Sequence, residues 1–163
     1  MTPAQALLWK EIKGFEIDDL DSSFTFTDRL ARENGWTIEY ALRAILEYKK
    51  FIFMICISRQ SLTPSDEVDQ VWHLHLLYTV SYWIEMCRDI LKKDIHHGPT
   101  KGGQNEKDKY RDLYQDTKDF YQLLFKEEPP EDIWPSSEIR FGQIRFTRIN
   151  RHRNWVVPKF KLN

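Results

Sequence analysis

The sequence has little of what would mark a membrane or disulfide-bonded protein. Its most apolar run, residues 51–57, has seven residues and is too short to span a bilayer. There are two cysteines, Cys56 and Cys87, in no C-x-x-C pair. We therefore expect buried thiols rather than a disulfide or a thiolate metal site. The start shows no secretory signal pattern, which favours a cytoplasmic protein.

Acidic residues are missing from one end of the chain. Residues 140–163 hold seven Lys or Arg and no Asp or Glu. The other 139 residues hold 17 basic and 25 acidic side chains, so the net charge of −1 combines an acidic body with a basic tail. We therefore divide the chain into a helical domain, residues 1–139, and a basic, extended or β-like tail, residues 140–163, packed on the same domain.

Aromatic residues and helical spacing predict the fold. Six Trp, seven Tyr and ten Phe in 163 residues favour one packed domain. Apolar periodicity and capping residues predict a mainly all-α protein of five or six helices. The clearest start is Thr63 as an N-cap followed by Pro64. Thr27 and Thr37 are expected to cap the two helices before it, and Gly35 to end the first of them. The second carries one apolar stripe, formed by Tyr40, Ala41, Ala44, Ile45, Tyr48 and Ile52. The expected helices begin at Pro3 and run over Asp28–Asn34, Ile38 to about Ser58, Pro64 to about Tyr78, Tyr82–Leu91 and Glu106 to about Lys126.

Four of the five histidines lie within 25 residues, in the pairs His73/His75 and His96/His97. Histidine is well suited to metal ligation and to proton transfer near neutral pH. On a helix Asp69 and His73 are i,i+4 neighbours on one face. At about 100° per residue, His75 points roughly 160° away from His73 and faces the core or the opposite surface.

A metal site is the leading hypothesis. Asp69, His73 and His97 are the preferred ligands, with His96 as the substitute for His97. Zinc is the default ion, and iron suits two His and one carboxylate with open positions. No motif for an organic cofactor is present.

The metal hypothesis extends to a metal-dependent, hydrolytic enzyme. A metal-bound water would be the reactive species, and His75 or Glu67 would move protons if either reaches it. Aromatic side chains and one base are expected to line a pocket beside the histidines. These pocket residues are Trp72, Tyr78, Tyr82 and Lys101.

Non-catalytic interpretations remain open. The Asp69–His73 pair also suits a hydrogen-bonded structural pair, and the loop histidines also suit a scaffold module that binds a protein partner or a small molecule. The tail offers basic and aromatic side chains for a nucleic acid. Burial of Ile144, Phe146, Ile149 and Val156 favours packing on the acidic body instead, and nucleic-acid binding is the weaker alternative.

Several long motifs resemble the glycine-rich domain-containing protein-like family. They are Val68–His75 (VDQVWHLH) with Tyr78, Tyr82 and Trp83, His96–Gly103 (HHGPTKGG) and Pro129–Pro135 (PPEDIWP). The segments Arg29–Trp36 (RLARENGW) and Asn154–Lys159 (NWVVPK) are similar to the bacterial branch of that family.

The resemblance covers nearly the whole chain but implies little about chemistry. It implies that Asp69, Trp72, His73, His75, His96 and His97 are motif positions, and it assigns none of them a role. In plants the related region belongs to larger proteins with a Gly-rich part, linked broadly to development and stress responses. This chain has six Gly and no such tract, so that part is not carried over.

Overall fold

The structure is a computed structural model that describes residues 1–19, 21–98, 104–142 and 152–157. Within these residues it has seven helices and no strand, which confirms the mainly all-α fold. None of these helices has both the length and the apolar character needed to cross a bilayer. The helices are α1 (Pro3–Gly14), α2 (Phe26–Asn34), α3 (Ile38–Ile57), α4 (Asp66–Leu77), η1 (Val80–Leu91), α5 (Gln104–Phe125) and α6 (Ser137–Arg140).

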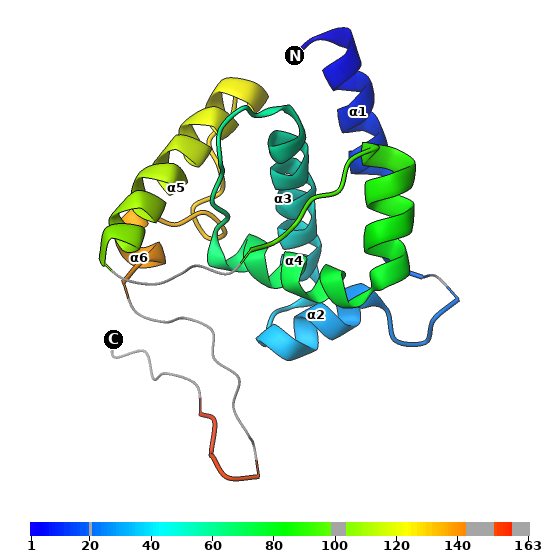
Figure 1. Cartoon of the computed structure of the whole chain (residues 1–163). Helices are drawn as coiled ribbons and strands as arrows, with labels where there is room; N and C mark the ends of the chain where they lie inside the picture. Colours follow the sequence, from blue (N-terminus) through cyan, green and yellow to red (C-terminus); the bar gives the residue numbers. More distant parts are fainter. Residues whose placement is uncertain (20, 99–103, 143–151, 158–163) are drawn as a thin grey trace.

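Helix α3 forms the centre of the fold (Figure 1). Helices α1, α2 and α4 all pack on it, and η1 packs on α1 and α4. The stripe that the sequence predicts for α3 is buried, as each of its members except the half-buried Tyr40 is less than a tenth exposed. These buried members are Ala41, Ala44, Ile45, Tyr48 and Ile52. Burial of this stripe against the neighbouring helices stabilises the packing of α3.

The ends of α2 and α3 follow local capping chemistry. The Thr37 side chain accepts a hydrogen bond from the Tyr40 amide, as expected for the N-cap of α3. Gly35 ends α2 in the left-handed region with φ 68°, where a residue without a Cβ is not strained.

Helix α2 begins two residues earlier than the sequence predicts. Thr25 caps it, in a reciprocal capping box with Asp28. Thr27 is instead held by a residue nine positions away, because Asp18 accepts hydrogen bonds from both its amide and its hydroxyl, at 2.8 and 2.6 Å. A tertiary contact therefore uses the hydroxyl that we expected to cap the helix.

Helix α4 begins two residues later than predicted. Ser65 is the N-cap and accepts from the Val68 amide at 3.2 Å. The amide of Thr63 donates to Thr117 Oγ1 of α5 at 3.0 Å, so this threonine joins two elements rather than starting a helix. Pro64 consequently precedes the helix.

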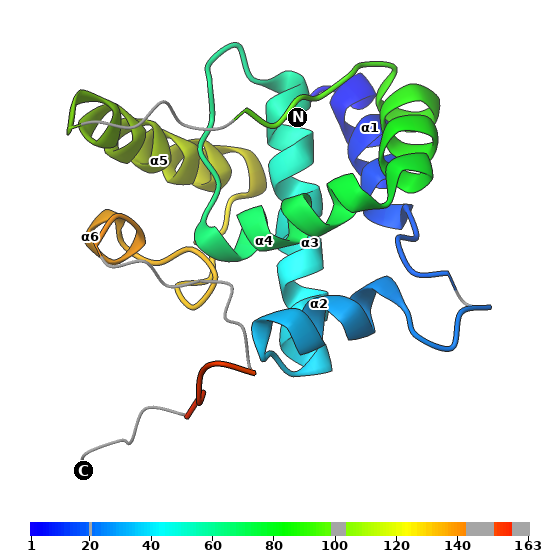
Figure 2. The ribbon, with the colours of Figure 1, turned by 60° about the horizontal axis from the view of Figure 1, so that its bottom comes forward.

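The helix after α4 is a π-helix, not the α-helix expected over Tyr82–Leu91. Its backbone follows the wider i→i+5 pattern, which is rare and is found frequently at functional sites. It ends at Lys92, which adopts the left-handed conformation with φ 52° while its amide donates to the Cys87 carbonyl. Figure 2 shows η1 at the end of α4, with α1 beside it.

A buried polar network fastens α5 and the segment before α6 to α3. The Glu47 carboxylate, 4% exposed, accepts from Trp134 Nε1 at 2.9 Å and from the Tyr121 hydroxyl at 3.2 Å. Lys50 Nζ lies 2.9 Å from the same carboxylate. A buried carboxylate with three donors is stable because each of its charged oxygens is satisfied.

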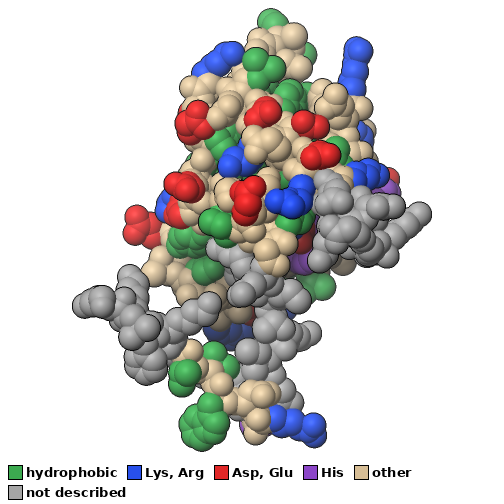
Figure 3. Space-filling model, turned by 90° about the vertical axis from the view of Figure 1, so that its left-hand side faces the viewer, with side chains coloured by type: hydrophobic (Ala, Val, Ile, Leu, Met, Phe, Trp, Pro, Cys, Tyr) green, Lys and Arg blue, Asp and Glu red, His purple; other side chains and the backbone are tan. Residues whose placement is uncertain are grey.

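Two parts of the tail are described, residues 140–142 and 152–157. Arg140 in the first pairs with Asp66 of α4, whereas the second is exposed. Trp155 and Val156 are 98% and 56% exposed, and packing of the tail on the body stays a prediction. Ile144, Phe146 and Ile149, which were expected to pack as well, lie outside the described residues. Figure 3 shows acidic and basic side chains interspersed on the face above this segment.

Candidate metal centre

Asp69, His73 and His97 come together as the sequence predicts. One nitrogen or oxygen from each residue lies within 4.8 Å of the other two. His97 Nε2–H donates to Asp69 Oδ1 at 2.6 Å, and His73 Nε2 lies 3.7 Å from Asp69 Oδ2. Among the described residues this is the one group of three or more His, Cys, Asp or Glu side chains with such spacing.

Helix geometry accounts for the first two members of this cluster. Asp69 lies in the first turn of α4, and His73 follows one turn later on the same face. The Asp69 side chain is 19% exposed and that of His73 is 52% exposed. Solvent and ions therefore reach this face of α4.

His97 reaches the cluster because the loop after η1 is anchored just before it. The Tyr82 hydroxyl donates to the Ile95 carbonyl at 2.6 Å and accepts from Trp72 Nε1 at 2.9 Å. Ile95 itself is buried. The Trp72 ring also lies against the His97 ring, with their centroids 4.4 Å apart. The position of His97 is thus fixed by the anchored Ile95 before it and by the Trp72 ring beside it.

Two imidazoles and one carboxylate form a donor set for zinc or ferrous iron. The set is incomplete on its own, because a tetrahedral zinc ion takes four ligands and six-coordinate iron takes more. The exposed side of His73 leaves room for water in the remaining positions.

The expected substitute ligand, His96, is not part of this cluster. Its side chain is exposed and its ring lies 5.3 Å from that of Trp83. Neighbouring side chains on the loop thus diverge, and His97 alone turns toward α4. Lys101, expected to line the pocket, lies outside the described residues.

His75 is out of position for moving protons at this cluster, which corrects the sequence prediction. It is fully buried, with Nδ1 hydrogen-bonded to the Tyr48 hydroxyl at 2.9 Å and Nε2 to Ser81 Oγ at 3.2 Å. Burial, and to a smaller extent the charge of Lys49, lower the pKa of His75 to about 3. The imidazole is therefore neutral at physiological pH.

Glu67 is also misplaced for the proposed proton transfer. It precedes Asp69 by two residues, and hence projects about 160° away from it on α4. Its side chain is 1% exposed, on the buried face. The cluster consequently has no proton carrier among the two residues that the sequence suggested.

The expected pocket residues divide between two places. Trp72 and Tyr82 support His97, as described. Tyr78 instead lines a separate cavity with Ser81 and Glu85. Sequence analysis missed that cavity, because its walls come from segments about 60 residues apart and no local motif marks them.

Comparisons of the chain with protein-family models, curated proteins and solved structures find no match.

Proposed function

We propose that this protein is a metal-binding domain in which Asp69, His73 and His97 hold one zinc or iron ion. The observation that carries the proposal is the convergence of two imidazoles and one carboxylate within 4.8 Å. His97 is 24 residues from His73 and 28 from Asp69 in the sequence. A helix pair such as Asp69–His73 arises often on surfaces, but a third donor delivered by an anchored loop is a stronger indication of a ligand site.

The donor set fits an ion with little rearrangement. Nε2 of His97 carries the proton in its hydrogen bond to Asp69, so metal binding replaces that proton and exchanges the hydrogen bond for coordination. The loop keeps its anchor through Ile95 and Tyr82 during this exchange. The rings of His73 and His97, with centroids 4.6 Å apart, already lie next to each other.

We propose further that any catalysis is metal-dependent and hydrolytic. A bound metal ion would supply a water molecule of lowered pKa. The chain's own contribution is to orient this site: Asp69 and His97 are mostly covered, while His73 faces solvent on the side from which a substrate would enter.

Elemental analysis of untagged protein, purified without added metal, tests the metal proposal. We expect close to one equivalent of zinc or iron in the wild type, and a loss of most of it in His73→Ala, His97→Ala and Asp69→Asn. His96→Ala is the matched control, because it removes the neighbouring loop histidine that does not contribute to the cluster. Circular dichroism checks that each variant folds.

Two results would overturn the metal proposal. One is protein without metal that takes up neither zinc nor ferrous iron on titration. The other is a metal content that survives replacement of both His73 and His97, because the ion would then lie elsewhere.

A scaffold role is the second candidate, and the direct hydrogen bond between His97 and Asp69 favours it. This bond already ties the loop after η1 to α4 without an ion. In a scaffold, His97→Ala lowers the melting temperature by the same amount with and without chelator. In a metal site, chelator alone reproduces most of the loss.

We also propose a cytoplasmic location and membership of the glycine-rich domain-containing protein-like family. Two free cysteines, Cys56 and Cys87, support a reducing compartment. The long motifs around His73 and His97 support the family. Nucleic-acid binding through the tail stays a prediction, since Arg145, Arg148 and Arg151 lie outside the described residues.

A further inference from the structure

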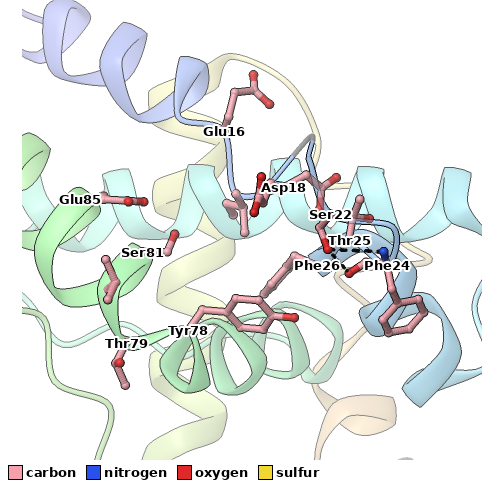
Figure 4. A pocket seen from close by; sticks show the side chains of 13 residues that line it. Glu16, Asp18, Ser22, Phe24, Thr25, Phe26, Tyr78, Thr79, Ser81 and Glu85 are labelled. Atoms are coloured by element: carbon pink, nitrogen blue, oxygen red, sulfur yellow. Dashed lines mark hydrogen bonds between the residues drawn. The ribbon is translucent and has the colours of Figure 1, made fainter.

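A cavity of about 560 Å³ lies between the α1–α2 connection and the junction of α4 with η1. This volume falls in the range of small-molecule sites. Figure 4 shows Ser81 and Glu85 on the η1 side, Asp18 opposite them, and the rings of Tyr78 and Phe26 along another wall. The cavity shares no lining residue with the Asp69–His73–His97 cluster.

The lining of the cavity is negatively charged. Four carboxylates contribute to it, from Glu16, Asp18, Asp19 and Glu85, and no Lys, Arg or His does. Asp18 is partly occupied by its hydrogen bonds to Thr27. A cavity of this composition repels anions and concentrates cations.

One buried cation lies behind this wall. Lys49 is 9% exposed, and its Nζ donates to the Lys13 and Phe15 carbonyls. Its single positive charge interacts with Glu16 and Asp18, and one cation against four carboxylates leaves the lining with a net negative charge. The cavity therefore stays acidic after this internal charge is counted.

Three aromatic rings, with Ile17 and Val80, make up the apolar part of the walls, and two of the rings already contact cations. The guanidinium carbons of Arg29 and Arg32 lie 5.8 and 4.4 Å from the ring centroids of Tyr78 and Phe24. Neither arginine lines the cavity. Phe26, with its ring centroid 5.2 Å from that of Tyr78, completes the aromatic wall. Such rings attract a desolvated organic cation, whereas they offer no ligand atom to a bare metal ion.

A fixed hydroxyl adds a directional contact. Ser81, in the first turn of the π-helix, is hydrogen-bonded to the fully buried His75. Tyr48 holds the other nitrogen of that imidazole. The Ser81 oxygen is thereby kept at one place on the cavity wall, and π-helical segments are found frequently at functional sites.

We propose that this cavity binds a small aliphatic ammonium ion. The Glu85 and Asp18 carboxylates neutralise its charge, the Ser81 oxygen accepts one N–H, and the Tyr78, Phe24 and Phe26 rings cover its methylene groups. A protonated alkyl diamine has this combination of separated charges and apolar stem. The proposal is independent of the metal cluster.

Isothermal titration calorimetry with putrescine tests the proposal. We expect saturable binding of putrescine and none of butanediol, its uncharged counterpart of similar shape. Calcium chloride at equal ionic strength should compete only weakly, because the aromatic walls favour the organic ion. No heat from putrescine, or equal binding of calcium and putrescine, would overturn the proposal.

Variants locate the binding. Glu85→Gln should weaken putrescine binding about fivefold, as expected for one partly solvated charge contact. Glu11→Gln, the same charge change on α1 outside the cavity, should leave it unchanged. Tyr78→Leu should also weaken binding; if it lowers the stability of the fold, Phe24→Leu replaces it, because Phe24 is 42% exposed. Equal effects of Glu85→Gln and Glu11→Gln would place the ion elsewhere and contradict the proposal.

Discussion

His73 and His75 are two residues apart on the same helix and have opposite surroundings. The His73 side chain is 52% exposed and lies 3.7 Å from an Asp69 oxygen. His75 is fully buried between the hydroxyls of Tyr48 and Ser81. The helical period of 3.6 residues places them on opposite faces of α4, one toward solvent and one toward α3.

This difference separates a side chain that can exchange partners from one that cannot. His97 can exchange its hydrogen bond to Asp69 for a metal ion, and His73 its 3.7 Å contact, because the exposed His73 leaves this face of α4 open to solvent. His75 has both nitrogens satisfied in the core, so replacing either partner costs the desolvation of a buried polar group. We therefore assign ligand binding to one face of α4 and structural support to the other.

The largest expected effect is that of removing the buried histidine. His75→Ala should lower the free energy of unfolding by about 2–4 kcal/mol, because it leaves a cavity and deprives the buried Tyr48 hydroxyl of its partner. His73→Ala, measured without metal, should change it by less than about 0.5 kcal/mol. Urea unfolding measures both. An equal loss of unfolding free energy in His73→Ala and His75→Ala would contradict the distinction between the two faces of α4.

Acid should sharpen the comparison further. His75 has a pKa of about 3 in the folded protein, below the ordinary histidine value of 6.5, so the unfolded chain binds the proton more readily. Its contribution to stability is complete above pH 6.5 and is lost as the pH falls toward 3, with a slope of up to about 1.4 kcal/mol per pH unit.

The variant His75→Gln isolates this contribution, because glutamine does not titrate. Its free energy of unfolding should fall less steeply between pH 6.5 and 4 than that of the wild type. The carboxylates titrate in both proteins, so their contributions cancel in the difference between the two free energies of unfolding. Parallel curves would mean that His75 is protonated as easily in the folded protein as in the unfolded chain.

A smaller effect is expected for the loop histidine. His97→Ala should cost about 1 kcal/mol without metal, because it removes a charge-assisted hydrogen bond to Asp69. Amide hydrogen exchange should accelerate in residues 93–98, because the loop loses its hydrogen bond to α4. Unchanged exchange throughout this loop would show that His97 does not hold it.

The smallest effect is expected for His96. His96→Ala should change the free energy of unfolding by less than about 0.5 kcal/mol, because the side chain is exposed and touches only the Trp83 ring among the contacts described. A loss as large as that of His97→Ala, measured in the same urea titration, would mean that the two loop histidines act together.

The sequence was sufficient for those features that depend on local periodicity. The i,i+4 spacing of Asp69 and His73 placed both on one face, and the i,i+2 spacing placed His75 on the other. Thr37 and Gly35 marked helix ends because capping depends on neighbouring residues alone.

Features that depend on distant partners were not predictable in this way. Thr27 and Thr63 looked like helix caps, but each forms a hydrogen bond with a residue distant in sequence. His97 was preferred to His96 from the sequence, but the contact that turns it toward α4, the anchoring of Ile95 by Tyr82, became visible only in the structure. The amino-acid composition of η1 does not reveal that it is a π-helix, because a π-helix differs from an α-helix in which carbonyl accepts each amide hydrogen bond.

The most direct test of the division between the two faces of α4 is a long-range ¹H–¹⁵N spectrum of the imidazoles, recorded before and after one equivalent of zinc. We predict that His73 and His97 shift on zinc addition, while His75 keeps the signals of a neutral ring down to pH 5. A His75 that responds to zinc, or that becomes protonated near pH 6.5, with His73 and His97 unchanged, would contradict the assignment.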